Sequence, residues 1–167
     1  MIILVALIIN NCISMTHNNF IPLYLEKFIP YRLSVLANLV SQSLASLYVM
    51  QLGISPAEWR VMAVLATSDL YSVHSANGIC ARNNMDKVQV SRAIAKLIKS
   101  NLILRQAGKI DLRKTSLKLS AKGQQVYSKI VPLVLNKEKE LLSVLNQQEK
   151  KQLDTLLTKL HTHAKNI

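Results

Sequence analysis

The sequence predicts a mainly α-helical protein that contains one short β-hairpin. Apolar residues recur at intervals of three and four along most of the 167 residues, which is the spacing of one helix face. Only four Gly and four Pro occur, too few turn formers for an all-β sandwich or barrel. Half of the residues are hydrophobic, which is enough to build a core. The hairpin is indicated near residue 110, where the helical spacing gives way to alternation.

The first half of the chain predicts two substantial helices. The first covers about residues 30–51, where apolar residues share one face: Leu33, Leu36, Val40, Leu44 and Leu47. The second begins after Ser55, since a Ser N-cap followed by Pro56 and by Glu58 in the first turn is typical of a helix start. It extends to about Thr67 and precedes a loop over 68–73.

A short helix over about 75–83 leads to the most informative helix of the chain. Asp86 is its expected N-cap, and it extends to about Ser100. One face is apolar: Val90, Ala93, Ile94 and Leu97. The opposite face is polar and cationic: Lys87, Gln89, Ser91, Arg92, Lys96 and Lys99. Asn101 follows as the expected left-handed exit.

A hairpin and two terminal helices complete the expected elements. Residues 102–106 and 115–119 alternate as strands and flank a basic turn. Ser120 is the expected cap of the next helix, and a last amphipathic helix covers 147–164. Its apolar stripe consists of Leu153, Leu156, Leu157 and Leu160.

Positive charge is concentrated in the middle of the chain. The formal net charge is +12, and the stretch from Arg82 to Lys122 holds eleven Lys or Arg and two Asp, hence +9. Such an excess indicates a polyanionic partner, either nucleic acid or an anionic membrane surface. Because residues 1–31 are neutral overall, the binding surface is expected in the middle of the chain.

A helix, a turn, an N-capped helix and then a basic hairpin is the order of a winged helix-turn-helix. The cationic helix suits a major groove, which admits one helix. We therefore expect a winged helix-turn-helix module over 54–120, with a small β-hairpin wing. Residues 20–53 and 121–167 are expected to form a helical dimerisation lobe, and 1–15 an apolar leader.

Four separated segments of the chain resemble the MarR-type (multiple antibiotic resistance regulator) family of transcriptional regulators. They are residues 55–60, 85–97, 111–113 and 117–123, within a similarity that covers roughly 28–160. Asn83 and Asn84 depart from the Leu and Gly that are frequent in the family's turn. The resemblance implies a homodimer in which each winged module reads one half-site of double-stranded DNA. The long apolar stripes of the terminal helices agree with such an interface.

Roles on the recognition helix follow from position and chemistry. Gln89 and Arg92 are the best candidates for reading base edges, Arg on guanine and Gln on adenine. Ser91 suits a base or a phosphate, whereas Lys87 and Lys96 suit phosphates.

The wing carries a second set of candidates. Arg113 is expected to enter a narrow minor groove, where the negative potential is high. Asp111 would repel phosphate and is expected to orient a neighbouring cation. Lys114 either holds phosphate or serves solubility.

The resemblance also implies a small aromatic or anionic effector lodged between the lobe and the winged module. The residues that could border such a cleft are Trp59, Arg60, Tyr71 and His74. The alternative is that Trp59 belongs to the core and Arg60 is a surface cation.

Other chemistry is not indicated. The four His do not form a metal motif, and there is no glycine-rich phosphate loop. We therefore expect no enzyme activity, no cofactor and no metal.

The apolar run at residues 1–9 is too short to span a bilayer, which takes about 20 residues, and lacks the basic start of a signal peptide. Either translation begins at Met15 or the leader packs on a partner subunit. The expected location is the cytoplasm, without a membrane partner.

Two functions remain open on the sequence alone. The leading one is a sequence-specific, ligand-responsive repressor that binds an inverted repeat as a homodimer. The other is a winged-helix architectural module that binds DNA non-specifically or docks a protein. Polar side chains suited to reading bases favour the first.

Overall fold

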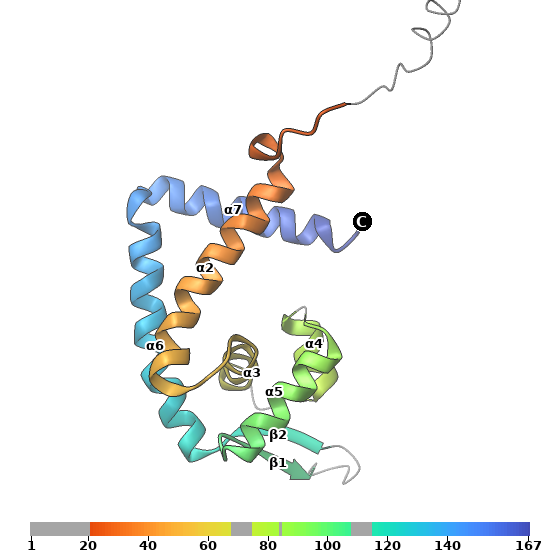
Figure 1. Cartoon of the computed structure of the whole chain (residues 1–167), viewed down its shortest axis with the longest axis vertical. Coiled ribbons are helices and arrows are strands. Elements are labelled where there is room, and N and C mark those ends of the chain that lie inside the picture. The colour runs from red at the N-terminus through yellow and green to blue at the C-terminus, as the bar shows by residue number, and fades with distance from the viewer. Residues whose placement is uncertain (1–20, 68–74, 84, 108–114) are drawn as a thin grey trace, which may run out of the picture. The chain divides into compact units, whose positions relative to one another are not determined.

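The structure, a computed structural model, describes residues 21–67, 75–83, 85–107 and 115–167 (Figure 1). The chain divides into two compact units, Met1–Asn38 and Leu39–Ile167. The predicted leader at 1–15, the loop at 68–73 and most of the turn between the strands lie outside the described residues.

The described part of the first unit consists of η1 (Leu25–Lys27) and the beginning of α2 (Ile29–Leu52). Its side chains are exposed, and the Lys27 ammonium lies 5.9 Å from the centroid of the Tyr24 ring. Among the described helices, α2 alone is long and apolar enough to cross a membrane by length and composition. The second half of α2, which belongs to the second unit, places Tyr48 in the core.

The second unit contains three short helices followed by a two-stranded sheet. These elements are α3 (Pro56–Thr67), α4 (Ala76–Asn83), α5 (Lys87–Lys99), β1 (Ile103–Ala107) and β2 (Thr115–Leu119). Helix α3 contacts α4, α5 and β2, and α4 contacts α5. The strands are antiparallel, with Ile103 opposite Leu119. The predicted class, mainly α with a winged helix-turn-helix and a small hairpin, is thereby confirmed.

Caps confirm the predicted starts of α3 and α5. The Ser55 backbone N–H donates to Glu58 Oε2 at 2.7 Å, and the Glu58 N–H donates to Ser55 Oγ at 3.3 Å. Asp86 Oδ1 accepts from the N–H groups of Val88 and Gln89 at 2.8 and 2.9 Å. These bonds satisfy N–H groups that the first turn of a helix leaves unpaired.

The passage from α5 into β1 depends on two tight local arrangements. Asn101 has φ of 57°, the left-handed exit that its sequence position predicted. The Ser120 N–H then donates to the Leu102 carbonyl at 3.0 Å, and Ser120 Oγ donates to the Asn101 carbonyl at 2.7 Å. These bonds tie the beginning of the next helix to the end of α5.

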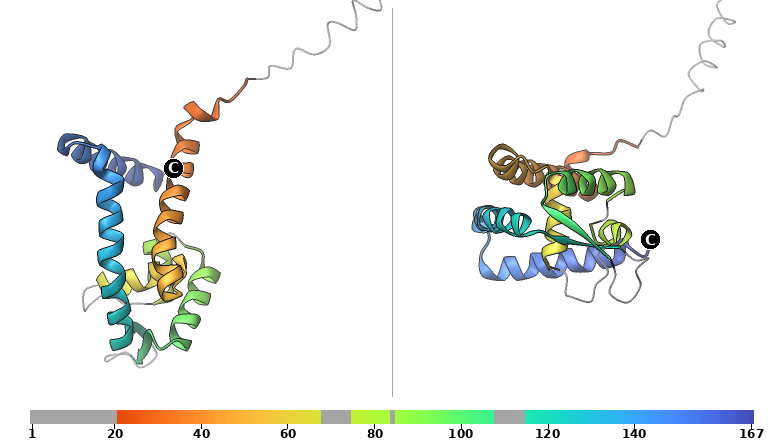
Figure 2. Two further views of the ribbon diagram at one scale, coloured as in Figure 1. Left: turned by 60° about the vertical axis from the view of Figure 1, so that its left-hand side comes forward. Right: turned by 90° about the horizontal axis from the view of Figure 1, so that it is seen from below.

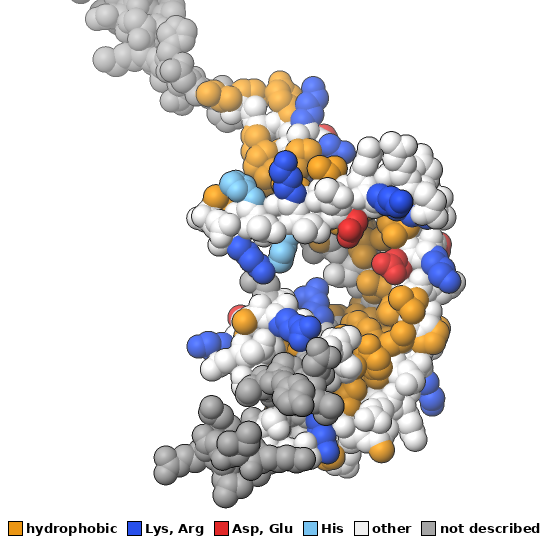
Figure 3. All heavy atoms as spheres, turned by 180° about the vertical axis from the view of Figure 1, so that it is seen from behind, with side chains coloured by type: hydrophobic (Ala, Val, Ile, Leu, Met, Phe, Trp, Pro, Cys, Tyr) orange, Lys and Arg blue, Asp and Glu red, His pale blue; other side chains and the backbone are white. Residues whose placement is uncertain are grey.

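The chain continues through α6 (Ala121–Leu141), η2 (Leu142–Val144) and α7 (Gln147–Ala164), turning at η2 (Figure 2). Asn146 and Glu149 form a reciprocal capping box at the start of α7. No residue of α7 is buried, and its leucines Leu153, Leu156, Leu157 and Leu160 are exposed. Figure 3 shows hydrophobic side chains gathered over part of one face of the molecule.

One hydrophobic core organises the second unit. Its largest fully buried side chains are Val61, Met62, Ile79, Val90, Leu97, Ile103 and Ile130. They come from α3, α4, α5, β1 and α6, so burial joins the winged module to the helix that follows it. The four residues predicted as the apolar stripe of α5 are all buried.

Candidate nucleic-acid interface

Helix α5 presents a polar, cationic face to solvent. Its buried stripe anchors one side of the helix against α3 and α4, so the opposite side is exposed. The residues of this helix that were predicted for DNA contact are all exposed: Lys87, Gln89, Ser91, Arg92 and Lys96. Lys99 is exposed as well. A rigid helix with such a face has the dimensions and donors that a major groove accepts.

Within the described part of the chain, the side chains of Gln89 and Arg92 make no hydrogen bond or ion pair. Their donors are therefore available to a partner. Both lie in the first two turns after the Asp86 cap. This is the end of a recognition helix that meets base edges in helix-turn-helix proteins.

The strands of the hairpin add cations that the site prediction did not include. Arg105 in β1 and Lys118 in β2 are both exposed. Each stands opposite an apolar neighbour, because Arg105 pairs with Leu117 and Lys118 with Leu104. In β2, Lys118 stands between the buried Leu117 and Leu119, and this alternation could have revealed it. The predicted wing residues Asp111, Arg113 and Lys114 lie outside the described residues.

Trp59 and Arg60, predicted to border an effector cleft, have different surroundings. Trp59 is half-buried against the core, and its ring is stacked near Tyr127 with centroids 5.4 Å apart and planes at 21°. The centroid of the Tyr48 ring lies 5.9 Å from that of Trp59. Burial raises the pKa of the Tyr48 phenol, an effect that the Arg60 charge opposes. Arg60 itself is exposed.

The Arg60 carbonyl accepts a hydrogen bond from Asn83 Nδ2 at 3.2 Å, which ties α4 to α3. Tyr71 and His74, the other two predicted cleft residues, lie outside the described residues. The cleft therefore stays a prediction. Among the described residues, no group of three His, Cys, Asp or Glu is placed to hold a metal ion.

These features define a winged helix-turn-helix protein. Three helices share one core, a two-stranded antiparallel wing follows them, and the third helix has an exposed basic face. Residues 52–113 match the model of the MarR family. The winged-helix region of the chain is thus similar to this family.

The chain is also similar to individual transcription regulators. The HTH-type transcriptional regulator BilQ of Clostridium symbiosum is 34% identical over 86 residues, which are 52% of this chain and 60% of BilQ. This chain thus spans less than two thirds of that curated relative.

A MarR/EmrR family regulator from Acinetobacter sp. ADP1 superposes with a TM-score of 0.79 at 28% identity, over 87% of this chain and all of that one. The S. aureus MepR–DNA complex gives 0.74 at 19% identity, over 83% and 98% of the two chains. At 19% identity the MepR match establishes the fold.

Proposed function

We propose that this protein is a transcription regulator that binds double-stranded DNA sequence-specifically through α5. The observation that carries the proposal is the exposed face of α5, on which cations alternate with hydrogen-bonding side chains while the opposite face is fixed in the core. Cations alone would give non-specific affinity, whereas Gln89 and Arg92 add groups that distinguish base pairs.

The match of residues 52–113 to the MarR family model supports a regulator rather than an enzyme, and the similar protein BilQ is a transcriptional regulator by name. MepR, which shares the fold, was solved in complex with DNA. Both support DNA as the partner of this chain, and a DNA-binding regulator is expected to act in the cytoplasm.

We further propose a homodimer that binds an inverted repeat and represses transcription. The exposed leucines of α7 support dimerisation. A stripe of large apolar side chains is unfavourable in contact with water, and contact with a second subunit would bury it. A two-fold dimer places two recognition helices in symmetric relation, so its target is an inverted repeat. A small aromatic or anionic effector would release it.

Binding of a labelled random-sequence duplex tests whether α5 is the DNA-binding element. We expect Lys87→Ala/Arg92→Ala to bind more weakly than wild type. The slope of log affinity against log salt should fall by about 0.9 for each phosphate that the variant no longer neutralises. The matched control, Lys151→Ala/Lys159→Ala, removes the same charge from exposed positions of α7 and should bind like wild type. Equal weakening in both variants would show that net charge, not α5, determines binding.

A further inference from the structure

An apolar side chain stands in the middle of the cationic face of α5. Val88 is 57% exposed and lies between Lys87 and Gln89. Successive residues of an α-helix are rotated by about 100°, which places Val88 opposite the buried stripe that includes Val90 and Leu97. By the same rotation Gln89 lies to one side. Val88 is therefore nearer to the centre of the exposed face than Gln89, which the sequence indicated as a base reader.

Neither helix formation nor core packing explains a valine at this position. Its β-branched side chain makes valine a poorer helix former than alanine or lysine. Among the residues of α5, all of which the structure describes, Val88 is the only large hydrophobic one that is exposed. Single exposed apolar residues are common on protein surfaces, so the position of Val88, and not its exposure alone, carries the argument.

The neighbours of Val88 on the helix surface are residues suited to a major groove. Ser91 and Arg92 follow it by three and four residues, so their Cβ atoms lie about 5–6 Å away. Ala95, two turns after Val88, is exposed on the same face. Because the alanine side chain is small, it lets the helix approach the floor of a groove. The centre of the face thus combines an apolar contact, a cation and a site of close approach.

The first turn of α5 holds Val88 in place. The Val88 N–H donates to Asp86 Oδ1 at 2.8 Å, so the cap fixes the backbone that carries the side chain. A valine in a helix strongly prefers one χ1 rotamer. The two methyl groups of Val88 are therefore held in one orientation before any partner binds, which lowers the entropy cost of a contact.

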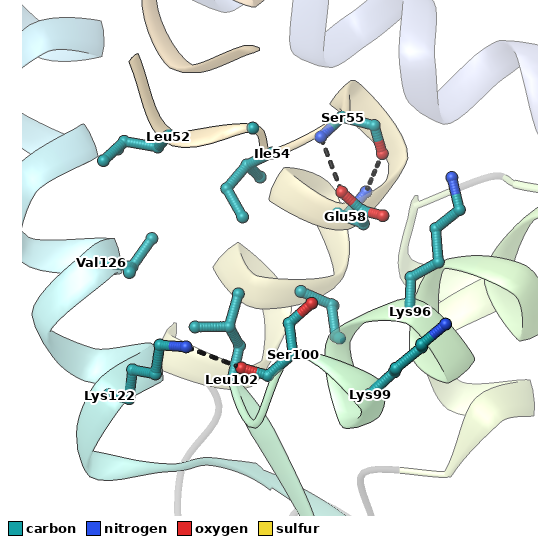
Figure 4. A pocket seen from close by; sticks show the side chains of 12 residues that line it. Leu52, Ile54, Ser55, Glu58, Lys96, Lys99, Ser100, Leu102, Lys122 and Val126 are labelled. Atoms are coloured by element: carbon teal, nitrogen blue, oxygen red, sulfur yellow. Dashed lines mark hydrogen bonds between the residues drawn. The ribbon is translucent and has the colours of Figure 1, made fainter. Parts of the chain in front are cut away.

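The other end of α5 has different surroundings. It borders a pocket of about 480 Å³, which is also lined by the turn between α2 and α3 and by the beginning of α6 (Figure 4). Lys122 Nζ of α6 donates to the Ser100 carbonyl at 3.0 Å. The carboxyl end of α5 is thus joined to the helix that follows the hairpin, and we place base reading in the first two turns.

We propose that Val88 contacts the C5-methyl group of a thymine in the major groove and so selects thymine at one position of each half-site. This inference rests on the proposed function. Of the four bases, thymine alone presents a methyl group in the major groove, and apolar side chains recognise it. Residues four apart lie about 5–6 Å apart and base pairs about 3.4 Å, so this thymine lies within about two base pairs of the base that Arg92 reads.

Replacement of thymine by deoxyuridine tests the contact, because it removes the methyl group and keeps the base-pairing edge. The probes are the duplex that the full chain selects from a random library and its derivatives with one thymine replaced at a time. We expect wild type to lose about three- to fivefold in affinity at one thymine of each half-site, the effect of one buried methyl group. The other replacements should change affinity less than twofold.

Val88→Ala assigns the methyl contact to this residue. The variant should bind the thymine duplex about three- to fivefold more weakly per half-site and should not distinguish thymine from deoxyuridine. Alanine is the better helix former, so a loss of folding is not expected. Val144→Ala is the matched control: it makes the same change at an exposed valine of η2 and should keep the thymine preference of wild type.

The outcomes separate this inference from the proposed function. An enriched motif without any effect of deoxyuridine, or with an equal effect in wild type and Val88→Ala, would overturn the role of Val88 and leave the regulator intact. Weakening of all duplexes alike by Val88→Ala would place the residue against the sugar–phosphate backbone and also overturn it. Absence of any enriched motif would overturn the proposed function, and this inference with it.

Discussion

At Gly123 the backbone of α6 passes close to Leu102 at the beginning of the hairpin. A Cβ placed on Gly123 would overlap the carbonyl oxygen of Leu102, which accepts the N–H of Ser120. Glycine usually weakens a helix by about 1 kcal/mol relative to alanine. Its presence at this position is explained by the lack of room for a side chain and not by helix propensity. The close approach sets the distance between α6 and the winged module.

Gly123→Ala should therefore destabilise the protein by about 1–3 kcal/mol, the typical cost of forcing an atom into a filled space. Urea unfolding at one fixed protein concentration measures the change. Gln124→Ala, at an exposed neighbouring position of α6, is the control and should leave the free energy of unfolding unchanged or slightly higher. A Gly123→Ala protein as stable as wild type would mean that α6 can move away at no cost in stability.

Arg92 and Lys96 are expected to contribute differently to DNA binding. Arg92→Ala should cost about 1–3 kcal/mol on the preferred site and relax discrimination at one base position of each half-site. Lys96→Ala should weaken all sequences alike and reduce the salt dependence. Affinities for a set of single-base variants of the site, each at several salt concentrations, distinguish the two.

The same profile in both variants would contradict the assignment of a base reader and a phosphate contact to α5. For the wing, the expectation that Arg113→Ala reduces affinity most at sites with A·T-rich flanks remains a prediction from the sequence.

The sequence could predict the exposed face of α5 because the spacing of the apolar residues along one helix determines which residues face the core and which face solvent. Val90 and Ala93 lie on one side and Arg92 on the other at any register of an α-helix. The pocket could not be predicted in this way. Leu52, Lys99 and Val126 come from three separated segments, and only tertiary packing brings them to one cavity. The same holds for the stacking of Trp59 near Tyr127.

At the scale of the element, the stability of helix α5 depends on the hydrogen bonds of its first turn. Asp86 accepts hydrogen bonds from two backbone N–H groups and places a negative charge at the positive end of the helix dipole. Asp86→Ala should lower the free energy of unfolding by about 0.5–2 kcal/mol, whereas Asp86→Asn keeps the acceptor and should remain close to wild type. Thermal or urea unfolding of the three proteins measures this. Equal stability of the Ala and Asn variants would show that the cap bonds contribute little.

The elements themselves were predictable where local chemistry marks their ends. Asp86 and Asn101 bracket α5, and Ser120 marks the start of α6, so expected and observed bounds agree closely. The long helix α2 was predicted from its apolar spacing, but the spacing does not indicate which part enters the core. In the structure only Tyr48 of α2 is buried.

At the scale of the whole molecule, α7 carries the prediction of dimerisation. Leu156→Glu should weaken association and with it DNA affinity, because burying an unpaired carboxylate costs several kcal/mol. Leu157→Glu is expected to act alike. Thr155→Glu is the matched control: it adds the same charge at the neighbouring exposed position, outside the leucine stripe. Sedimentation velocity at micromolar concentration measures the oligomeric state.

A wild-type monomer, or equal weakening by Thr155→Glu, would contradict a role for the leucine stripe in dimerisation. The sequence could predict this surface because leucines at helical spacing form an apolar stripe that is expected to be buried against another surface. The arrangement of the two subunits depends also on the second surface, which the sequence of one helix does not specify.

Selection from a random duplex library by the purified full chain tests the central claim most directly. A dimer with two α5 helices predicts enrichment of an inverted repeat whose half-site centres lie about one helical turn of DNA, or a multiple of it, apart. Arg92→Ala should relax the preference at one position of each half-site. Retention of DNA without any enriched motif would contradict sequence-specific regulation and favour an architectural role for the winged module.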